Sequence, residues 1–150
     1  MALSVYRTIV LACLVMAGFG LFSCDRGPKK EARFEVTEQE FIIRNLKDKP
    51  HAYVIDAIGK IKNVGTADAK RVVVTGNCVS CGEQILMGQW FTSKIEKTDA
   101  QKDTISYIAV GNEEEFAFTD VALMYNDTPK PPTHMPEKFE ILIESFEPVE

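Results

Sequence analysis

The chain has 150 residues, with 17 Lys and Arg against 22 Asp and Glu, a net charge of −5 and 45% apolar residues. A chain of this length is expected to form one domain with a substantial core. The acidic balance argues against nucleic acid as a partner, because Lys and Arg must neutralise phosphates there, and it supplies no basic patch for anionic lipid.

The first predicted element is a secretory signal in residues 1–23. Arg7 supplies its charged start, and residues 9–22 follow as an uncharged, largely apolar run. The run is too short to cross a hydrocarbon core, which takes roughly 20 residues. Residues 21–24, Leu-Phe-Ser-Cys, resemble the lipobox of bacterial lipoproteins. The resemblance implies cleavage before Cys24 and acylation of that residue.

Cleavage there would leave residues 24–150, with 16 basic and 22 acidic side chains and a net charge of −6. Acyl chains would then hold the protein in the lipid bilayer, each buried methylene contributing about 0.8 kcal/mol. We therefore expect a protein of the bacterial cell envelope, anchored through Cys24 to the periplasmic or surface face of a membrane. An uncleaved anchor and an ordinary signal cut nearby are the alternatives. Residues 24–33 are polar and are predicted to be a tether.

The remainder, residues 34–150, is predicted to be one antiparallel β-sandwich of seven to eight strands. Apolar residues alternate with a period of two, and turn signals separate the runs. Such short runs at about 8–12-residue spacing are typical of immunoglobulin-like sandwiches. One helical turn is compatible with residues 93–102. The predicted strands lie within residues 34–43, 53–61, 72–74, 85–91, 105–109, 116–118, 121–125 and 139–143.

Two stretches of this domain carry a family resemblance. They are GKIKNVG at residues 59–65, followed by AKRVVV at 69–74, and VGNE at 110–113 ahead of Phe116. They are similar to the small bacterial immunoglobulin-like domains of the FxLYD and CARDB groups, over residues 54–118. The resemblance implies that an asparagine and a glycine reverse the chain between two strands. It also implies an envelope setting and no catalytic activity. The chain departs from the pattern where GNCVSCG replaces an aromatic-aspartate-x-x-glycine hairpin.

Cys78 and Cys81 form the one local motif with chemical content. Of the four cysteines, Cys13 leaves with the signal and Cys24 takes the lipid, and an exported chain usually oxidises a remaining pair. In an extended strand the two Cα atoms would lie about 10 Å apart, beyond the roughly 4.4–6.8 Å of a disulfide. A bridge therefore needs a turn, and the flanking glycines favour a hairpin tip at residues 79–80. It would add about 2 kcal/mol of stability.

Two other roles for the cysteine pair stay open. A thioredoxin-like redox pair would open a helix, and c-type haem attachment needs a histidine where Gly82 stands. Two thiolates joined by the thioether of Met87 or Met135 would favour Cu(I). The competing interpretation is that the methionines, Met124 included, fill the core and that His134 faces solvent. We expect a structural disulfide, with no cofactor and no metal.

The aromatic residues Trp90, Phe91, Tyr107 and Phe116 are predicted to fill the core rather than to form a binding platform. A better interaction candidate is the loop of residues 128–136, whose prolines limit the entropy lost on docking. Its candidate contact residues are Pro131, Pro132, His134 and Met135.

Catalysis has little support in the sequence. Residues 113–115, Glu-Glu-Glu, are expected to be a solvated turn, neither histidine has the context of a nucleophile–base pair, and no phosphate-binding loop follows a strand. The sequence therefore predicts a non-enzymatic binding or accessory module. It would present residues 76–82 and 128–136 to an envelope protein or polymer. The alternative is a thiol redox or copper-handling protein centred on Cys78 and Cys81.

Overall fold

The structure, a computed structural model, describes residues 30–92 and 96–149, so the signal, the predicted acylation site Cys24 and most of the tether lie outside the described residues. Within that part, no helix is long and apolar enough to cross a membrane. The described elements are β1 (Phe34–Asn45), β2 (Ala52–Asn63), β3 (Ala69–Cys78), β4 (Trp90–Phe91), the 3-10 turn η1 (Asp99–Gln101), β5 (Lys102–Ile108), β6 (Glu113–Tyr125) and β7 (Phe139–Pro148).

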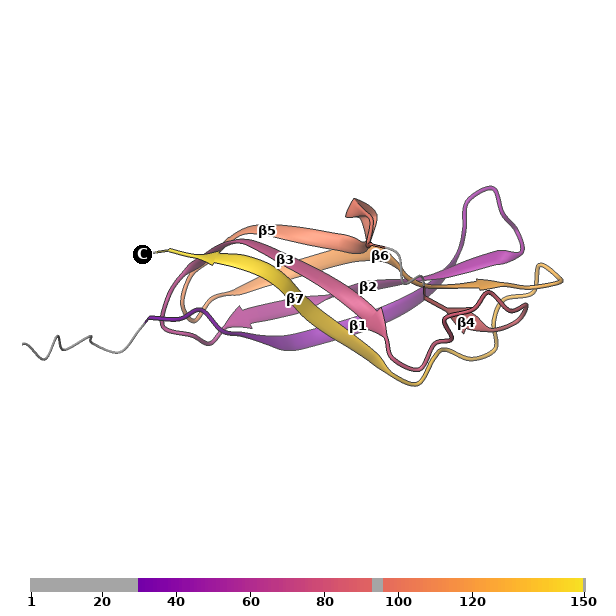
Figure 1. The fold of residues 1–150 in the computed structure, drawn as a ribbon, viewed down its shortest axis with the longest axis horizontal. Helices are drawn as coiled ribbons and strands as arrows, with labels where there is room; N and C mark the ends of the chain where they lie inside the picture. Colours follow the sequence, from indigo (N-terminus) through magenta and orange to yellow (C-terminus); the bar gives the residue numbers. More distant parts are fainter. Residues whose placement is uncertain (1–29, 93–95, 150) are drawn as a thin grey trace, which may run out of the picture.

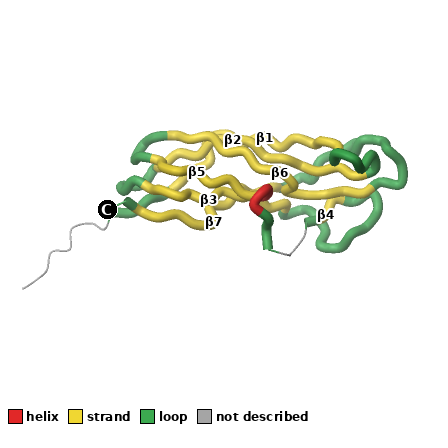
Figure 2. The backbone as a smooth tube through the Cα atoms, turned by 90° about the horizontal axis from the view of Figure 1, so that it is seen from above, coloured by secondary structure: helices red, strands yellow, loops and turns green. Residues whose placement is uncertain are grey.

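These strands form two sheets that pack face to face, as Figures 1 and 2 show. One sheet has the order β1-β2-β6-β4 and the other β5-β3-β7, and all their pairings are antiparallel. Only the β1–β2 hairpin stays within one sheet; each later connection between described strands crosses to the opposite sheet. The predicted antiparallel β-sandwich is confirmed, and its two-sheet arrangement is consistent with an immunoglobulin-like fold.

Alternating side chains from both sheets fill the core. Trp90 is only 6% exposed and belongs to it, as predicted. Tyr107 was predicted to lie there too, and this prediction was wrong, since Tyr107 is 47% exposed. Strand β5 buries Ile105 and Ile108 instead, so its inward face does not follow strict alternation. The Tyr107 hydroxyl donates to the carboxylate of Asp68 on the surface.

Asn63 ends β2 and holds the chain reversal that the resemblance implies. Its side chain is fully buried; the amide nitrogen donates to the carbonyls of Ala67, 2.8 Å away, and Ile108, 3.2 Å away. The side-chain oxygen accepts the backbone N–H of Gly65 at 3.0 Å. Every polar atom of this buried amide group therefore has a partner, which is the condition for burying it without a large cost. The turn carries the chain from one sheet to the other.

A bulge in β6 shapes the outer face of the larger sheet. Ile55 pairs with Ala122 and Ala57 with Phe118, so three residues of β6 face the single residue Asp56 of β2. Asp120 lies within the bulge at a φ of 59°, a left-handed conformation that aspartate tolerates better than most residues. Arg44 joins the two carboxylates, with nitrogens 2.5 Å from Asp56 and 3.2 Å from Asp120.

Several strand boundaries differ from the sequence prediction. Residues 85–87 are loop rather than strand, and residues 116–118 and 121–125 belong to the single strand β6. Residues 113–115, expected to be a turn, open that strand with exposed side chains. The helical turn allowed for residues 93–102 is present as η1. Residues 79–80 do turn, but no hairpin forms there, because β3 and the next strand belong to different sheets.

Candidate functional site: the distal loops

The sandwich has two unlike ends. The proximal end is defined by residues 30–33 with the turns at 64–68 and 109–112. Val149 also reaches it, because its backbone N–H donates to the carbonyl of Asp68. The distal end is defined by the loops at 46–51, 79–89 and 126–138, on the right of Figure 1. The backbone N–H of Thr66 donates to the Glu31 carbonyl, and the Glu31 N–H donates to the Thr66 hydroxyl. Ala32 is buried, so the chain is fixed to the domain from Glu31 onward.

The disulfide of the distal end joins Cys78 to Cys81. The two Cα atoms lie 5.4 Å apart, within the range that a bridge requires. Cys78 is buried as the last residue of β3, and Cys81 packs partly buried against the core. The predicted disulfide is therefore present, and it fixes the point where the chain leaves one sheet for the other. Neither sulfur is a thiolate in this state.

The two predicted binding loops lie against each other. The backbone N–H of Val79 donates to the carbonyl of Lys138 at 2.9 Å, and the N–H of Lys138 donates to the Ser80 hydroxyl at 3.0 Å. The indole N–H of Trp90 donates to the carbonyl of His134 at 3.1 Å. These bonds attach the proline-rich loop to the segment after the disulfide. Residues 76–82 and 128–136, far apart in sequence, thus lie at the same end of the domain, and their neighbours Lys138 and Trp90 provide the bonds that connect them.

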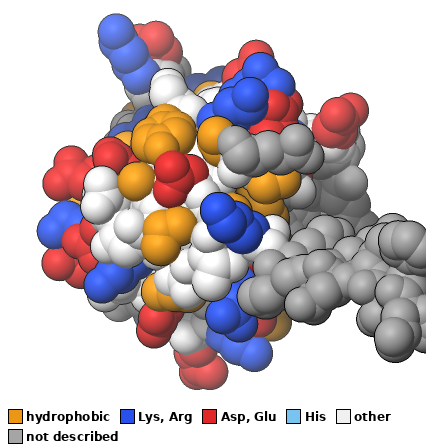
Figure 3. Space-filling model, turned by 90° about the vertical axis from the view of Figure 1, so that its left-hand side faces the viewer, with side chains coloured by type: hydrophobic (Ala, Val, Ile, Leu, Met, Phe, Trp, Pro, Cys, Tyr) orange, Lys and Arg blue, Asp and Glu red, His pale blue; other side chains and the backbone are white. Residues whose placement is uncertain are grey.

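A run of exposed apolar side chains lies beside this junction. Ile85 is 66%, Leu86 47% and Met87 54% exposed, and Val79 on the disulfide turn is exposed as well. Residues 85–87 were predicted to be a strand, and their exposure at the surface was not foreseen. The proximal end differs, because acidic and basic side chains are interspersed there with separate apolar ones (Figure 3). Contiguous exposed apolar residues of this kind are typical of interaction surfaces.

A hollow of about 410 Å³ opens between the distal loops of residues 79–89 and 126–138. Met87 and Gly88 line it from one side, Met124 from strand β6, and the proline-rich loop supplies His134. Pro131 and Pro132 also line it, whereas Met135 is half-buried and packs on the core. His51 does not reach the hollow. Of the four methionine and histidine residues considered as metal ligands, Met87, Met124 and His134 therefore line the same hollow. Met135 does not line it.

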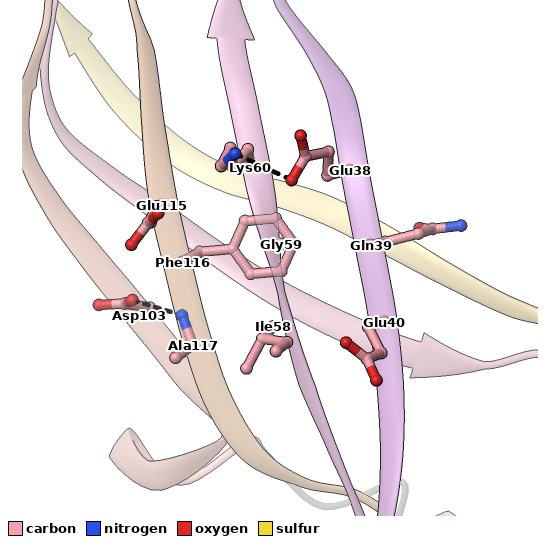
Figure 4. Close-up of a pocket in the computed structure, with 10 residues that line it drawn as sticks. All are labelled: Glu38, Gln39, Glu40, Ile58, Gly59, Lys60, Asp103, Glu115, Phe116 and Ala117. Carbon is pink, nitrogen blue, oxygen red and sulfur yellow. Dashed lines mark hydrogen bonds and ion pairs between the residues drawn. The ribbon is translucent and has the colours of Figure 1, made fainter.

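A larger hollow, about 570 Å³, lies on the outer face of the four-stranded sheet (Figure 4). Strand β2 contributes Ile58, Gly59 and Lys60 to it. Glu38 and Glu40 from β1 lie on the other side of this strand from Glu115 of β6. Lys60 pairs with Glu38 at 2.9 Å. Gln39 points away from the other labelled side chains, and the Asp103 carboxylate accepts the backbone N–H of Ala117 at 2.8 Å. Two carboxylates of this hollow, those of Glu38 and Asp103, thus already bond to neighbouring strands.

Comparison with known proteins gave no match: no protein-family model, no curated protein and no solved structure is significantly similar to this chain.

The ionisable groups of the described residues do not gather into a hard-metal site. No group of three or more His, Cys, Asp or Glu is placed to hold a metal ion in that part of the chain. Lys97 is the one described lysine whose pKa is lowered, because burial disfavours its charged form. Its ammonium donates to the Thr75 hydroxyl at 3.0 Å and to the carbonyl of Gly76, and so ties the segment before η1 to β3.

Proposed function

We propose that the chain is a bacterial envelope lipoprotein whose sandwich serves as a non-enzymatic binding module. Acyl groups on Cys24 would hold it in a membrane, and the distal loops would contact a partner protein or envelope polymer. The lipobox-like sequence of residues 21–24 supports the anchor. The supporting observation for the binding role is the position of the two loops.

The first described residues and the distal loops lie at opposite ends of the domain. The chain enters the sandwich at Glu31, which bonds to Thr66 at the proximal end. The exposed apolar residues Ile85, Leu86 and Met87 are at the distal end (Figure 1). A domain anchored at its proximal end would hold these residues away from the lipid surface. They would then be free to dock on a partner, where burying them is favourable by about 25 cal/mol per Å².

The binding role is tested by site-specific photo-crosslinking in cells that produce the full chain. A photoreactive side chain replaces Leu86, and in a matched control it replaces Val110 at the proximal end. The two positions are 47% and 46% exposed, so general accessibility is the same. We expect a discrete cross-linked partner from position 86 and none from position 110. Equal products from both positions, or none from either, would contradict the proposal.

The anchor is tested separately by intact-mass spectrometry of protein extracted from membranes. The expected species begins at Cys24 and carries acyl groups, and Cys24→Ser should move the protein out of the membrane fraction. An unmodified Cys24 in the membrane-bound protein would rule out lipidation while leaving the binding role to its own test.

A further inference from the structure

We propose that Met87, Met124 and His134 form a binding site for a soft monovalent cation, Cu(I) under physiological conditions. The three residues line the 410 Å³ hollow between the distal loops. The site is distinct from the disulfide and does not depend on the partner proposed above. It also differs from the copper site considered in the sequence, because Cys78 and Cys81 are bridged and offer no thiolate.

The donor set decides which metal the hollow fits. Two neutral thioethers and one imidazole select soft cations, whereas Ca²⁺, Mg²⁺ and Zn²⁺ prefer oxygen ligands or several histidines and thiolates. Asp127 and Lys130 also line the hollow, and their opposite charges leave it without a strong field of either sign. A site of neutral ligands suits a cation of charge +1, because little charge has to be compensated.

The segments that carry the donors are fixed to one another. The backbone N–H of Gly88 donates to the carbonyl of Tyr125 at 2.7 Å, so Met87 and Met124 are each next to one end of this bond. Gly88 has a φ of 74°, the left-handed conformation that turns the loop back onto β6. The Asn126 side chain donates to the carbonyl of Lys130 at 2.8 Å and closes the start of the proline-rich loop.

His134 is held in place by its own hydrogen bonds. Its backbone carbonyl accepts the indole N–H of Trp90, and its Nδ1 lies 3.3 Å from the Thr133 hydroxyl, which leaves Nε2 for a ligand. Met87 is more than half exposed and therefore is not a core filler. Three rotatable bonds allow the Met87 sulfur to move towards a bound ion. Met124 is 2% exposed and is held in the core at the wall of the same hollow.

The chain provides its own reporter for the test. Trp90 is its one tryptophan, and it is the direct cross-strand partner of Met124. A soft heavy cation bound at Met124 would quench the indole fluorescence. The probe is Ag(I), which has the ligand preference of Cu(I) but does not need a reductant that would open the disulfide. Free thiols of the detergent-extracted full chain are alkylated first, so that only thioethers and histidines remain as soft donors.

We expect one Ag(I) per chain by native mass spectrometry, with quenching of Trp90. Met87→Leu and His134→Gln should each weaken binding by at least tenfold, since both side chains are at the surface and their replacement leaves the core intact. Met135→Leu and His51→Gln are the matched controls, with the same donor types outside the hollow, and should bind as the wild type does. Absence of Ag(I) binding, or binding that Met87→Leu and His134→Gln both retain, would overturn the proposal. So would an equal loss in the two controls.

Discussion

Trp90 and His134 are 44 residues apart in sequence and are joined by a hydrogen bond of 3.1 Å from the indole N–H to the backbone carbonyl. The indole is almost fully buried, so this bond extends from the hydrophobic core to the surface loop. The bond gives the buried indole N–H the acceptor that it needs, and a plain hydrocarbon ring at this place in β4 could not make it.

Replacing Trp90 by Phe should destabilise the protein and loosen the proline-rich loop. The smaller ring leaves a void and the His134 carbonyl loses its donor, which together should lower the free energy of unfolding by about 2 kcal/mol or more. Limited proteolysis within residues 128–136 should become faster. Phe91→Leu is the control, since Phe91 is equally buried but its ring makes no hydrogen bond. If Phe91→Leu loosens the loop to the same extent, the hydrogen bond is not what holds it.

Opening the Cys78–Cys81 bridge should cost little stability. The closed loop is very short, so the entropy that it removes from the unfolded chain corresponds to about 2 kcal/mol. Urea unfolding of the same protein with and without reductant measures this without changing a side chain. Cys78→Ser with Cys81→Ser should retain the fold. Loss of cooperative unfolding in reductant would show that the bridge maintains the whole domain rather than the distal turn.

Gly59 should not tolerate a side chain. A Cβ there would lie 2.1 Å from the carbonyl oxygen of Glu38 and 2.6 Å from Cζ of Phe116, the residue directly across in β6. Gly59→Ala should therefore lower the free energy of unfolding by about 1–3 kcal/mol through overpacking. In Gly82→Ala, the nearest atom to the new Cβ is 3.7 Å away, an ordinary contact, so this control should unfold as the wild type does.

The ionised carboxylate of Asp68 should stabilise the folded state, and this contribution should be lost when the carboxylate is protonated at low pH. The hydroxyl of Tyr107 and the backbone N–H of Val110 donate to its carboxylate and hold its pKa below the ordinary value of 3.8. A folded-state pKa below the unfolded value means a contribution that is present above the unfolded value and lost as the pH falls through the folded one. Asp68→Asn should thus be less stable than the wild type at neutral pH.

The difference between wild type and Asp68→Asn should shrink as the pH falls below 3.8. Urea titrations of both proteins at neutral pH and below that value measure it. Tyr107→Phe removes the largest cause of the lowered pKa and should raise the pKa of Asp68 towards its ordinary value. A constant difference at all pH values would show that the charge of Asp68 is not involved.

Much of the fold follows from local patterns. The alternation in β7, the turn chemistry around Asn63 and the turn that lets Cys78 reach Cys81 are signals within a few residues, and the structure agrees with each. Tyr107 was misplaced because β5 does not alternate strictly, so a period of two puts the wrong residue inside. The sequence of residues 85–87 is as apolar as a buried strand, and only the tertiary structure shows that about half or more of each side chain is exposed.

The candidate site was only half predictable. The disulfide and the proline-rich loop could be predicted because each is a local sequence motif. Their proximity depends on the pairing of Cys78 with Phe139, which no local signal gives. The separation of Met135 from Met87, Met124 and His134 depends in the same way on which side of the loop faces the core.

The crossing of the chain between the two sheets after β2 has a kinetic consequence. Neither sheet can be completed from one continuous segment, because β6 must return to β2 and β7 must return to β3 across intervening strands of the other sheet. Loop closure therefore precedes most of the stabilising contacts, and folding in such topologies takes roughly milliseconds to seconds. A chain that is exported before it folds would thus remain unfolded through translocation. Its three-stranded sheet could be completed only once the last strand, β7, is available.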